Sequence, residues 1–353
     1  MLEIPRLTEL TRQDFVRNYL RPQVPFILTG EASQWPAVGK WSLDYLAETH
    51  LDHRVLVEFY PTQQRNHAYT YVEMTVGEYV QRIKSDPDAR HTYYIADTSV
   101  ESTLPEIKDD IRVPSIIQSD RGMRSALFFG CDTFSTAHYH RFRQQALLAQ
   151  VVGSKDVLLY PAKHLKHTYP NPWYGLRSNF SSIEMEFDNV HPEPEEYPNF
   201  TNADEYRCTV NAGEMLFIPD HWMHTVLGPG ENVTVTYFWP ESVRDCYLPG
   251  VVRDAFAYIN KMTLTGIARI GKPVGLHRLL LNLAVRLGIV PSDEREAVLQ
   301  HLEVFDGKLP GNVKQESMDT AVERNSAPTS HDSEPASRDS APTSRDSAPT
   351  SRV

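Results

Sequence analysis

Residues 137–140 read Ala-His-Tyr-His, and residues 213–224 read Gly-Glu-Met-Leu-Phe-Ile-Pro-Asp-His-Trp-Met-His. Side chains two residues apart on a β-strand point to the same face, so His138 and His140 can enter one pocket. In the second stretch a glycine turn, an apolar run and a proline set up another sheet segment, which ends at His224. The two stretches predict a sheet protein in which three imidazoles meet.

Three imidazoles on rigid strands suit a first-row metal, because neutral histidine is a good ligand and other coordination positions stay open for substrate and oxygen. We therefore predict that His138, His140 and His224 hold one iron. The chain has 14 histidines, so the second stretch is needed to support the His-x-His pair. His221 is left out of the ligand set, because an odd offset from His224 turns it to the opposite face of a strand.

The residues around these histidines predict a mainly β core. Residues 125–240 hold short apolar or β-branched runs separated by Pro, Gly and Asn, which is the pattern of an antiparallel sandwich or barrel. The clearest predicted strands are Leu127–Phe129, Ala146–Val152, Val157–Tyr160, Met215–Ile218 and Val233–Trp239.

The N-terminal flank, residues 1–124, mixes helical spacing with short strands. Helices are predicted at Arg12–Leu20 and Leu43–Thr49, and strands at Val24–Leu28 and Val55–Phe59. We expect an α+β section that packs on the barrel.

Helices and then a disordered tail are expected after the barrel. Residues 241–312 carry an apolar stripe that should pack on the barrel or form a homodimer contact, and its members are Leu276, Leu279, Leu280, Leu283 and Leu287. Residues 313–353 include four copies of a unit resembling Ser-Ala-Pro-Thr-Ser-Arg-Asp. Such a tail has too little apolar surface to order itself.

The composition is that of a globular protein with an acidic surface. The chain has 353 residues, 41% of them hydrophobic, and a net charge of -11, which argues against a nucleic-acid partner. No apolar run approaches the ~20 residues that a bilayer crossing requires, and the N-terminus lacks the parts of a secretory signal. The separated cysteines Cys131, Cys208 and Cys246 fit reduced thiols. A cytoplasmic protein without a membrane partner is expected.

The histidine spacings resemble the two motifs of the cupin family. The first motif, with Gln where that family usually has Glu, corresponds to Gly130-x7-His138-x-His140-x4-Gln145-x7-Gly153. The second corresponds to Gly213-x5-Pro219-x4-His224. A longer ordered series is similar to the JmjC-related cupin hydroxylases, the group of the asparaginyl hydroxylase of hypoxia-inducible factor. It comprises Arg21–Leu28, Trp35–Val38, Leu147–Pro161, Tyr169–Pro172, Tyr197–Phe200, Ile218–His224 and Tyr237–Trp239.

This resemblance implies a double-stranded β-helix (a JmjC-like jelly roll) that binds Fe(II) and 2-oxoglutarate and hydroxylates an unactivated C–H bond. The family's iron ligands, His-x-Asp and a distal His, map to His138, position 140 and His224. The family's other site residues map to a lysine for the distal carboxylate of 2-oxoglutarate, an assisting tyrosine and a nearby hydroxyl. These are Lys155, Tyr94 and either Ser135 or Thr136.

Position 140 departs from the family, because His140 stands where Asp is expected. Neutral imidazole raises the charge of the iron site by one unit, and three-histidine iron sites occur among cupin dioxygenases that use no 2-oxoglutarate. A gap-free count back from Lys155 would instead place His140 and Phe142 on the ligand positions. We prefer His138 and His140, because the cupin spacing fits and Phe142 cannot bind iron. Gln145 could add a weak fourth donor or order the ligand strand.

Three functions are compatible with these residues. The leading hypothesis is an Fe(II)- and 2-oxoglutarate-dependent dioxygenase that hydroxylates a peptide side chain or a small molecule. The second is a three-histidine dioxygenase or oxidase that works without 2-oxoglutarate and binds a chelating substrate directly. The third is a non-catalytic cupin binding protein.

Overall fold

The computed structural model describes residues 2–60, 70–118, 122–173, 177–258 and 286, all of which fall within the compact unit Met1–Leu299. The strands are β1 Arg6–Leu7, β2 Phe26–Leu28, β3 Arg54–Phe59, β4 Thr70–Thr75, β5 Tyr93–Ser99, β6 Arg124–His138, β7 Gln144–Val152, β8 Ser154–Tyr160, β9 Tyr206–Asn211, β10 Met215–Ile218 and β11 Met223–Pro240. The longer helices are α3 Leu43–Thr49, α4 Val76–Ser85 and α5 Pro87–Thr92. The short or irregular helices are α1 Arg12–Phe15, η1 Val16–Leu20, η2 Ala32–Gln34, α2 Ala37–Lys40, α6 Val100–Thr103, η3 Pro105–Asp110, η4 Ala162–Thr168, η5 Phe200–Asn202 and η6 Val243–Asp245.

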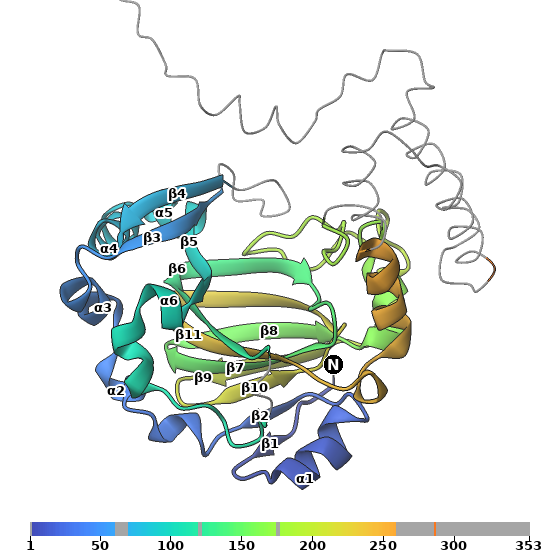
Figure 1. Cartoon of the computed structure of the whole chain (residues 1–353). Coiled ribbons are helices and arrows are strands. Elements are labelled where there is room, and N and C mark those ends of the chain that lie inside the picture. The colour runs from blue at the N-terminus through green and yellow to red at the C-terminus, as the bar shows by residue number, and fades with distance from the viewer. Residues whose placement is uncertain (1, 61–69, 119–121, 174–176, 259–285, 287–353) are drawn as a thin grey trace, which may run out of the picture. The chain divides into compact units, whose positions relative to one another are not determined.

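The long strand β11 joins the two halves of the sheet (Figure 1). Its first part, Met223–Leu227, pairs with β8, and its last part, from Val233 onward, pairs with β7. β6 pairs with β11 through both parts, and all of these pairs are antiparallel. The two halves therefore share β6 and β11, as in a jelly roll. The mainly β fold class predicted from the sequence is confirmed.

The N-terminal strands extend this same sheet. β1 and β2 add to the edge at β10, and β5, β3 and β4 add beyond β6. The helix α3 begins and ends where the sequence pattern placed it, whereas the predicted helix Arg12–Leu20 is one turn of α-helix followed by a π-helix. The N-terminal section is thus hydrogen-bonded into the barrel sheet as well as packed on it.

The helix α4 shows how local sequence sets this packing. Thr75 and Glu78 form a capping box that satisfies backbone N–H groups at the helix start. The buried face of α4 includes Tyr79, whose hydroxyl donates a 2.8 Å hydrogen bond to the carbonyl oxygen of Phe129 in β6. The helix is therefore attached to the strand that carries the first histidine of the site.

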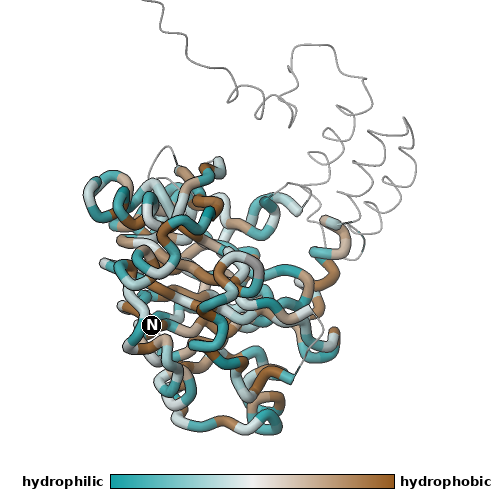
Figure 2. Tube along the Cα trace, turned by 60° about the vertical axis from the view of Figure 1, so that its left-hand side comes forward, coloured by the Kyte–Doolittle hydropathy of each residue, from teal (hydrophilic) through white to brown (hydrophobic). Residues whose placement is uncertain are grey.

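Alternation along the strands divides the core into layers. In β11, Trp239 packs with the N-terminal helices, and its neighbour Phe238 packs with the barrel interior. Phe217 joins the outer layer, with its ring centroid 5.0 Å from that of Phe15. Figure 2 shows hydrophobic residues gathered along the strands and hydrophilic residues on the outer loops.

The expected leucine stripe Leu276–Leu287 and the tail 313–353 lie outside the described residues. Residues 248–258 are helical. Among the described helices, none is long and apolar enough to span a bilayer. Cys131, Cys208 and Cys246 are free thiols.

We expect Gly153→Ala to destabilise the barrel. Gly153 turns the chain between β7 and β8 at φ +74°, and a Cβ there would lie 2.2 Å from the backbone oxygen of Glu231. A left-handed alanine alone costs about 1–2 kcal/mol, and the contact adds to this. Gly230→Ala is the matched control, because its φ is +64° but no atom lies within 4 Å of the added Cβ. In urea unfolding, Gly153→Ala should lose clearly more free energy than Gly230→Ala, and equal losses would contradict the steric argument.

Candidate metal centre

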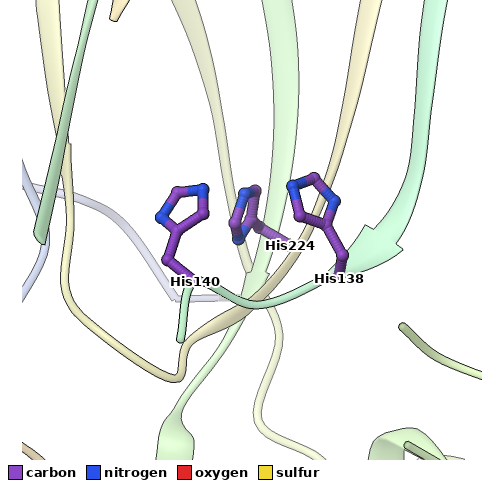
Figure 3. A group of neighbouring side chains, drawn as sticks. All are labelled: His138, His140 and His224. Atoms are coloured by element: carbon purple, nitrogen blue, oxygen red, sulfur yellow. The ribbon is translucent and has the colours of Figure 1, made fainter. Parts of the chain in front are cut away.

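Three histidine side chains converge inside the barrel. One ligand atom from each of His138, His140 and His224 lies within 4.8 Å of those of the other two. The ring centroid of His224 lies 4.4 Å from that of His138 and 4.6 Å from that of His140. Figure 3 shows the His224 ring between the other two. The structure therefore brings together the three imidazoles that the sequence singled out.

The sheet register and a turn place these rings. His138 is the last residue of β6 and pairs directly with His224 near the start of β11, so both side chains point to the same face. His140 lies beyond the end of β6, and its carbonyl oxygen accepts a 3.3 Å hydrogen bond from the N–H of His221. Strand pairing thus positions two of the rings, and the turn after β6 positions the third.

Backbone carbonyls fix the tautomers of two rings. Nδ1 of His138 lies 2.8 Å from the oxygen of Thr136, and Nδ1 of His224 lies 2.9 Å from the oxygen of Trp222. Because a carbonyl can only accept, each Nδ1 carries the proton and each Nε2 keeps its lone pair for a metal. Nδ1 of His140 is buried and has no hydrogen-bond partner among the described residues.

Burial keeps the three imidazoles neutral. Desolvation, together with the neighbouring His138, lowers the pKa of His224 to about 3. The pKa of His140 lies well below its ordinary value, and that of His138 is also lowered, again with desolvation as the largest cause. All three side chains therefore offer a lone pair at neutral pH, which metal binding requires.

Aromatic rings contact the three-histidine cluster. Phe180 stacks on His138 with centroids 5.4 Å apart, and Phe238 meets His140 edge-on at 5.1 Å. Arg177 lies over the Phe180 ring, and Arg124 lies over the Phe238 ring. Neither phenylalanine was predicted as a site residue: Phe180 lies in no motif, and Phe238 lies in the motif Tyr237–Trp239, which gave it no role at the metal.

Lys155 points into the same interior as the histidines. Lys155 and Leu159 lie an even number of residues apart on β8, so their side chains share a face. Leu159 pairs directly with His224, whose side chain therefore lies on that face too. The Lys155 ammonium lies 5.5 Å from the ring centre of Phe128, and the described residues include no carboxylate paired with it. Lys155 is 3% exposed, and this burial lowers its pKa to about 7.

The other predicted co-substrate residues lie on or beside this face. Tyr94 is buried, and its ring centroid lies 6.4 Å from that of Phe128, so Tyr94 and Lys155 approach the same ring. A bulge between the pairs His224–His138 and Val226–Ser135 lets Ser135 share the histidine face despite its odd offset. Thr136 is buried within that bulge.

The surroundings of Gln145 differ from those expected of a fourth metal donor. Its carbonyl oxygen accepts from the N–H of Asp220 at 3.1 Å, and its amide nitrogen donates to the Asp220 carboxylate at 3.1 Å. Both ends of the side chain are thus engaged. The geometry fits the alternative role, in which Gln145 orders the ligand segments.

Phe142 lies at the surface. The residue is 49% exposed, and its ring contacts that of Tyr258, with centroids 5.9 Å apart. The alternative register would need Phe142 beside His140 at the metal. The structure instead groups His138 and His140 with His224.

His221 is buried and contacts two acids. Asp220 lies 2.8 Å from its Nδ1, and Asp254 lies 3.0 Å from its Nε2. Burial opposes charge on His221, but the hydrogen bonds and charges of the two acids outweigh it and raise its pKa to about 9. Asp220 and Asp254 were missed by the sequence analysis, because only the fold brings Asp254 to this place.

The donor set fits a first-row metal such as Fe(II). Three neutral imidazoles leave further coordination positions open, and two of the rings have the carbonyl partners that commonly orient metal-binding histidines. The buried Nδ1 of His140 also needs a partner, which a water or a bound carboxylate could provide. His138, His140 and His224 are the residues that could hold the ion.

Comparison with known families gives one match over most of the chain. A family model described as a cupin-like domain matches residues 12–245.

The similar curated proteins include lysine-specific demethylases and tRNA wybutosine-synthesizing proteins. Lysine-specific demethylase 8 of Xenopus tropicalis is 28% identical over 241 residues, which are 67% of this chain and 52% of that protein. tRNA wybutosine-synthesizing protein 5 of Homo sapiens is 25% identical over 265 residues, covering 70% of this chain and 80% of the relative. The Danio rerio protein of the same name is 26% identical over 347 residues, 90% of this chain and 98% of the relative. The chain thus spans about half the length of the demethylase that it matches.

We expect His224 to make the metal-free protein sensitive to acid. The unfolded chain takes up a proton on this histidine below about pH 6.5, whereas the folded chain, with a pKa of about 3, does not. As the pH falls from 6.5 to 5, the parent should lose about 1 kcal/mol per pH unit relative to His224→Gln. Urea unfolding in the presence of a chelator measures this difference. A parent–His224→Gln difference that does not change with pH would contradict the expectation.

Proposed function

The chain belongs to the cupin-like domain family of JmjC-type proteins, and on that premise we propose that it is an Fe(II)- and 2-oxoglutarate-dependent oxygenase. The observation that carries the proposal is a buried ammonium, at Lys155, on the interior face that also holds the three converging imidazoles. The iron would be held by His138, His140 and His224. It would supply the oxygen chemistry for hydroxylation, and 2-oxoglutarate would supply two electrons as it is decarboxylated.

Lys155 gives the strongest support for an oxo-acid co-substrate. A buried cation is unfavourable unless an anion pairs with it, and the described residues provide none. A dicarboxylate can bind the metal with its oxo-acid end and Lys155 with its other carboxylate. The hydroxyls of Tyr94 and Ser135 are the groups on this face that would hydrogen-bond the same ligand.

The choice of substrate class follows from charge. Three neutral ligands leave the full charge of Fe(II), and Lys155 adds one more, so a dicarboxylate leaves one net positive charge in the site. That charge favours a substrate with an anionic or strongly polar group near the reacting carbon. The net charge of -11 favours a peptide side chain or small molecule over nucleic acid, although one group of relatives is named for tRNA wybutosine synthesis.

A second candidate function is a three-histidine dioxygenase that uses no oxo-acid. It is favoured by His140, because the cluster contains no carboxylate ligand. In that case a chelating, anionic substrate would bind the metal directly and supply the missing negative charge.

Calorimetry should distinguish these functions. We expect 2-oxoglutarate to bind the Ni(II)-loaded parent with saturation, and Lys155→Ala to weaken this binding at least tenfold, because the distal carboxylate loses its cation. Nickel stoichiometry should not change. Lys163→Ala is the matched control, since that side chain is 66% exposed and pairs with Asp204.

Two results would count against the first proposal. Metal-loaded parent without measurable affinity for 2-oxoglutarate would exclude it, and oxygen uptake independent of any oxo-acid would then support the three-histidine dioxygenase. A comparison with His140→Asp tests the departure from the family, because a carboxylate there should leave 2-oxoglutarate binding intact if Lys155 provides the anchor.

The affinity for 2-oxoglutarate should fall as the pH rises. In the free protein Lys155 has a pKa of about 7, so above pH 7 binding must first take up a proton. We expect the Kd to rise up to about tenfold per pH unit between pH 7 and 9. In Lys155→Arg, whose guanidinium stays charged, the Kd should change much less over this range. A parent Kd that is constant from pH 7 to 9 would contradict proton uptake by Lys155 on binding.

A further inference from the structure

A buried ionic cluster lies next to the candidate metal centre. The side chains of Asp220, His221 and Asp254 are at most 1% exposed. The two ring nitrogens of His221 each face a carboxylate oxygen, at 2.8 Å for Asp220 and 3.0 Å for Asp254. An ionised carboxylate can only accept, so both contacts are satisfied when both ring nitrogens carry protons. The cluster is therefore an imidazolium held between two carboxylates.

Asp254 fixes the turn that carries His140. One carboxylate oxygen accepts the N–H of Phe142 at 2.7 Å, and the other accepts the hydroxyl of Tyr139 at 3.4 Å. The Tyr139 ring also stacks on His221, with centroids 5.0 Å apart and ring planes 30° apart. Residues on both sides of His140 are thus bound to the same cluster.

His221 connects that turn to the segment of the third histidine. Its backbone N–H donates to the carbonyl oxygen of His140 at 3.3 Å, and it lies three residues before His224. Its φ is +60°, a conformation that a non-glycine residue keeps only when its surroundings hold it. Asp220 in turn is bound through its N–H and its carboxylate to Gln145 in β7.

The helical residues 248–258 close the cluster from the other side. A Cβ at Gly250 would lie 2.3 Å from Cδ2 of His221, so the helix backbone packs directly on the ring. Burying charged groups is unfavourable unless they are well paired, and this cluster pairs both nitrogens and adds backbone donors. It therefore forms a rigid connection between the turn after β6, the start of β11 and this helix.

We propose that the Asp220–His221–Asp254 cluster positions His140 and His224 for metal binding. This inference rests on the proposed function, since it assigns the cluster to the same metal centre. His221 acts here as a positioning residue, because its ring nitrogens are turned to the carboxylates. Its contribution is to hold two ligand segments at the separation that one ion requires, as the partners of metal-binding side chains do elsewhere.

Cobalt binding to full-length variants tests the proposal. We expect His221→Asn and Asp254→Asn to weaken Co(II) binding by about tenfold to a hundredfold and to alter the visible absorption of the bound ion. Gly250→Ala should act in the same direction, because its Cβ displaces the His221 ring without changing any charge. It also keeps the test valid if the charge variants fold poorly.

Asp245→Asn is the matched control. Asp245 is also buried, but it pairs with Arg21 and Arg244, and no hydrogen bond or ion pair among the described residues joins it to the cluster. It should bind Co(II) as the parent does, even where its melting temperature is lower. Cluster variants that keep the parent's affinity and absorption, or an equal loss in Asp245→Asn, would overturn the proposal.

Hydrogen exchange of the metal-free protein separates this inference from the proposed function. In His221→Asn, amides of residues 139–143 and 220–224 should exchange faster than in the parent or in Asp245→Asn. A parent that does not bind Co(II) would reject the metal centre, and with it the metal-binding role of the cluster. Unchanged exchange in a parent that does bind Co(II) would reject the cluster's positioning role alone.

Discussion

β11 and β6 form antiparallel pairs along most of their length, and the candidate site depends on this pairing. It places His138 directly opposite His224, so two imidazoles from distant parts of the sequence share one face. The same strand, β11, pairs with β8 at that end, which brings Lys155 to the interior. A one-residue shift of β11 against β6 would turn His224 out of the barrel and remove the cluster, because side chains alternate between faces.

All the histidines in this interior are desolvated, but they differ in charge state. No acid among the described residues forms an ion pair with His138, His140 or His224, so burial lowers their pKa values and leaves them neutral. His221 is equally buried, but two carboxylates outweigh the desolvation and raise its pKa to about 9. The same residue type therefore supplies lone pairs at one place and a cation three residues away. The acids decide between these roles, since a lone pair requires a neutral ring and an ion pair requires a charged one.

The absence of a carboxylate from the three-histidine cluster sets the charge that a ligand must balance. Three neutral donors and Lys155 make this interior more positive than a site with one Asp ligand. Arg124 adds to this positive environment, because its charge lowers the pKa of His140 although it also pairs with Asp97. An anionic ligand is therefore the natural partner of the site, whether it is an oxo-acid co-substrate or a chelating substrate. Both proposed functions follow from this charge, and they differ in which molecule carries the balancing anion.

The sequence by itself predicted the barrel class and the three histidines that converge inside it. Side-chain alternation and motif spacing are local properties, so they can be read from the sequence. It also placed α3 and most core strands, since their apolar patterns and caps lie within each segment. Only the tertiary structure decided that Ser135 shares the histidine face, because a bulge changes the parity of β6. Only the tertiary structure showed that Gln145 binds Asp220 and that Asp254 contacts His221, 33 residues away in the sequence. These contacts depend on strand register and helix docking, which the whole core sets and no short stretch of sequence encodes.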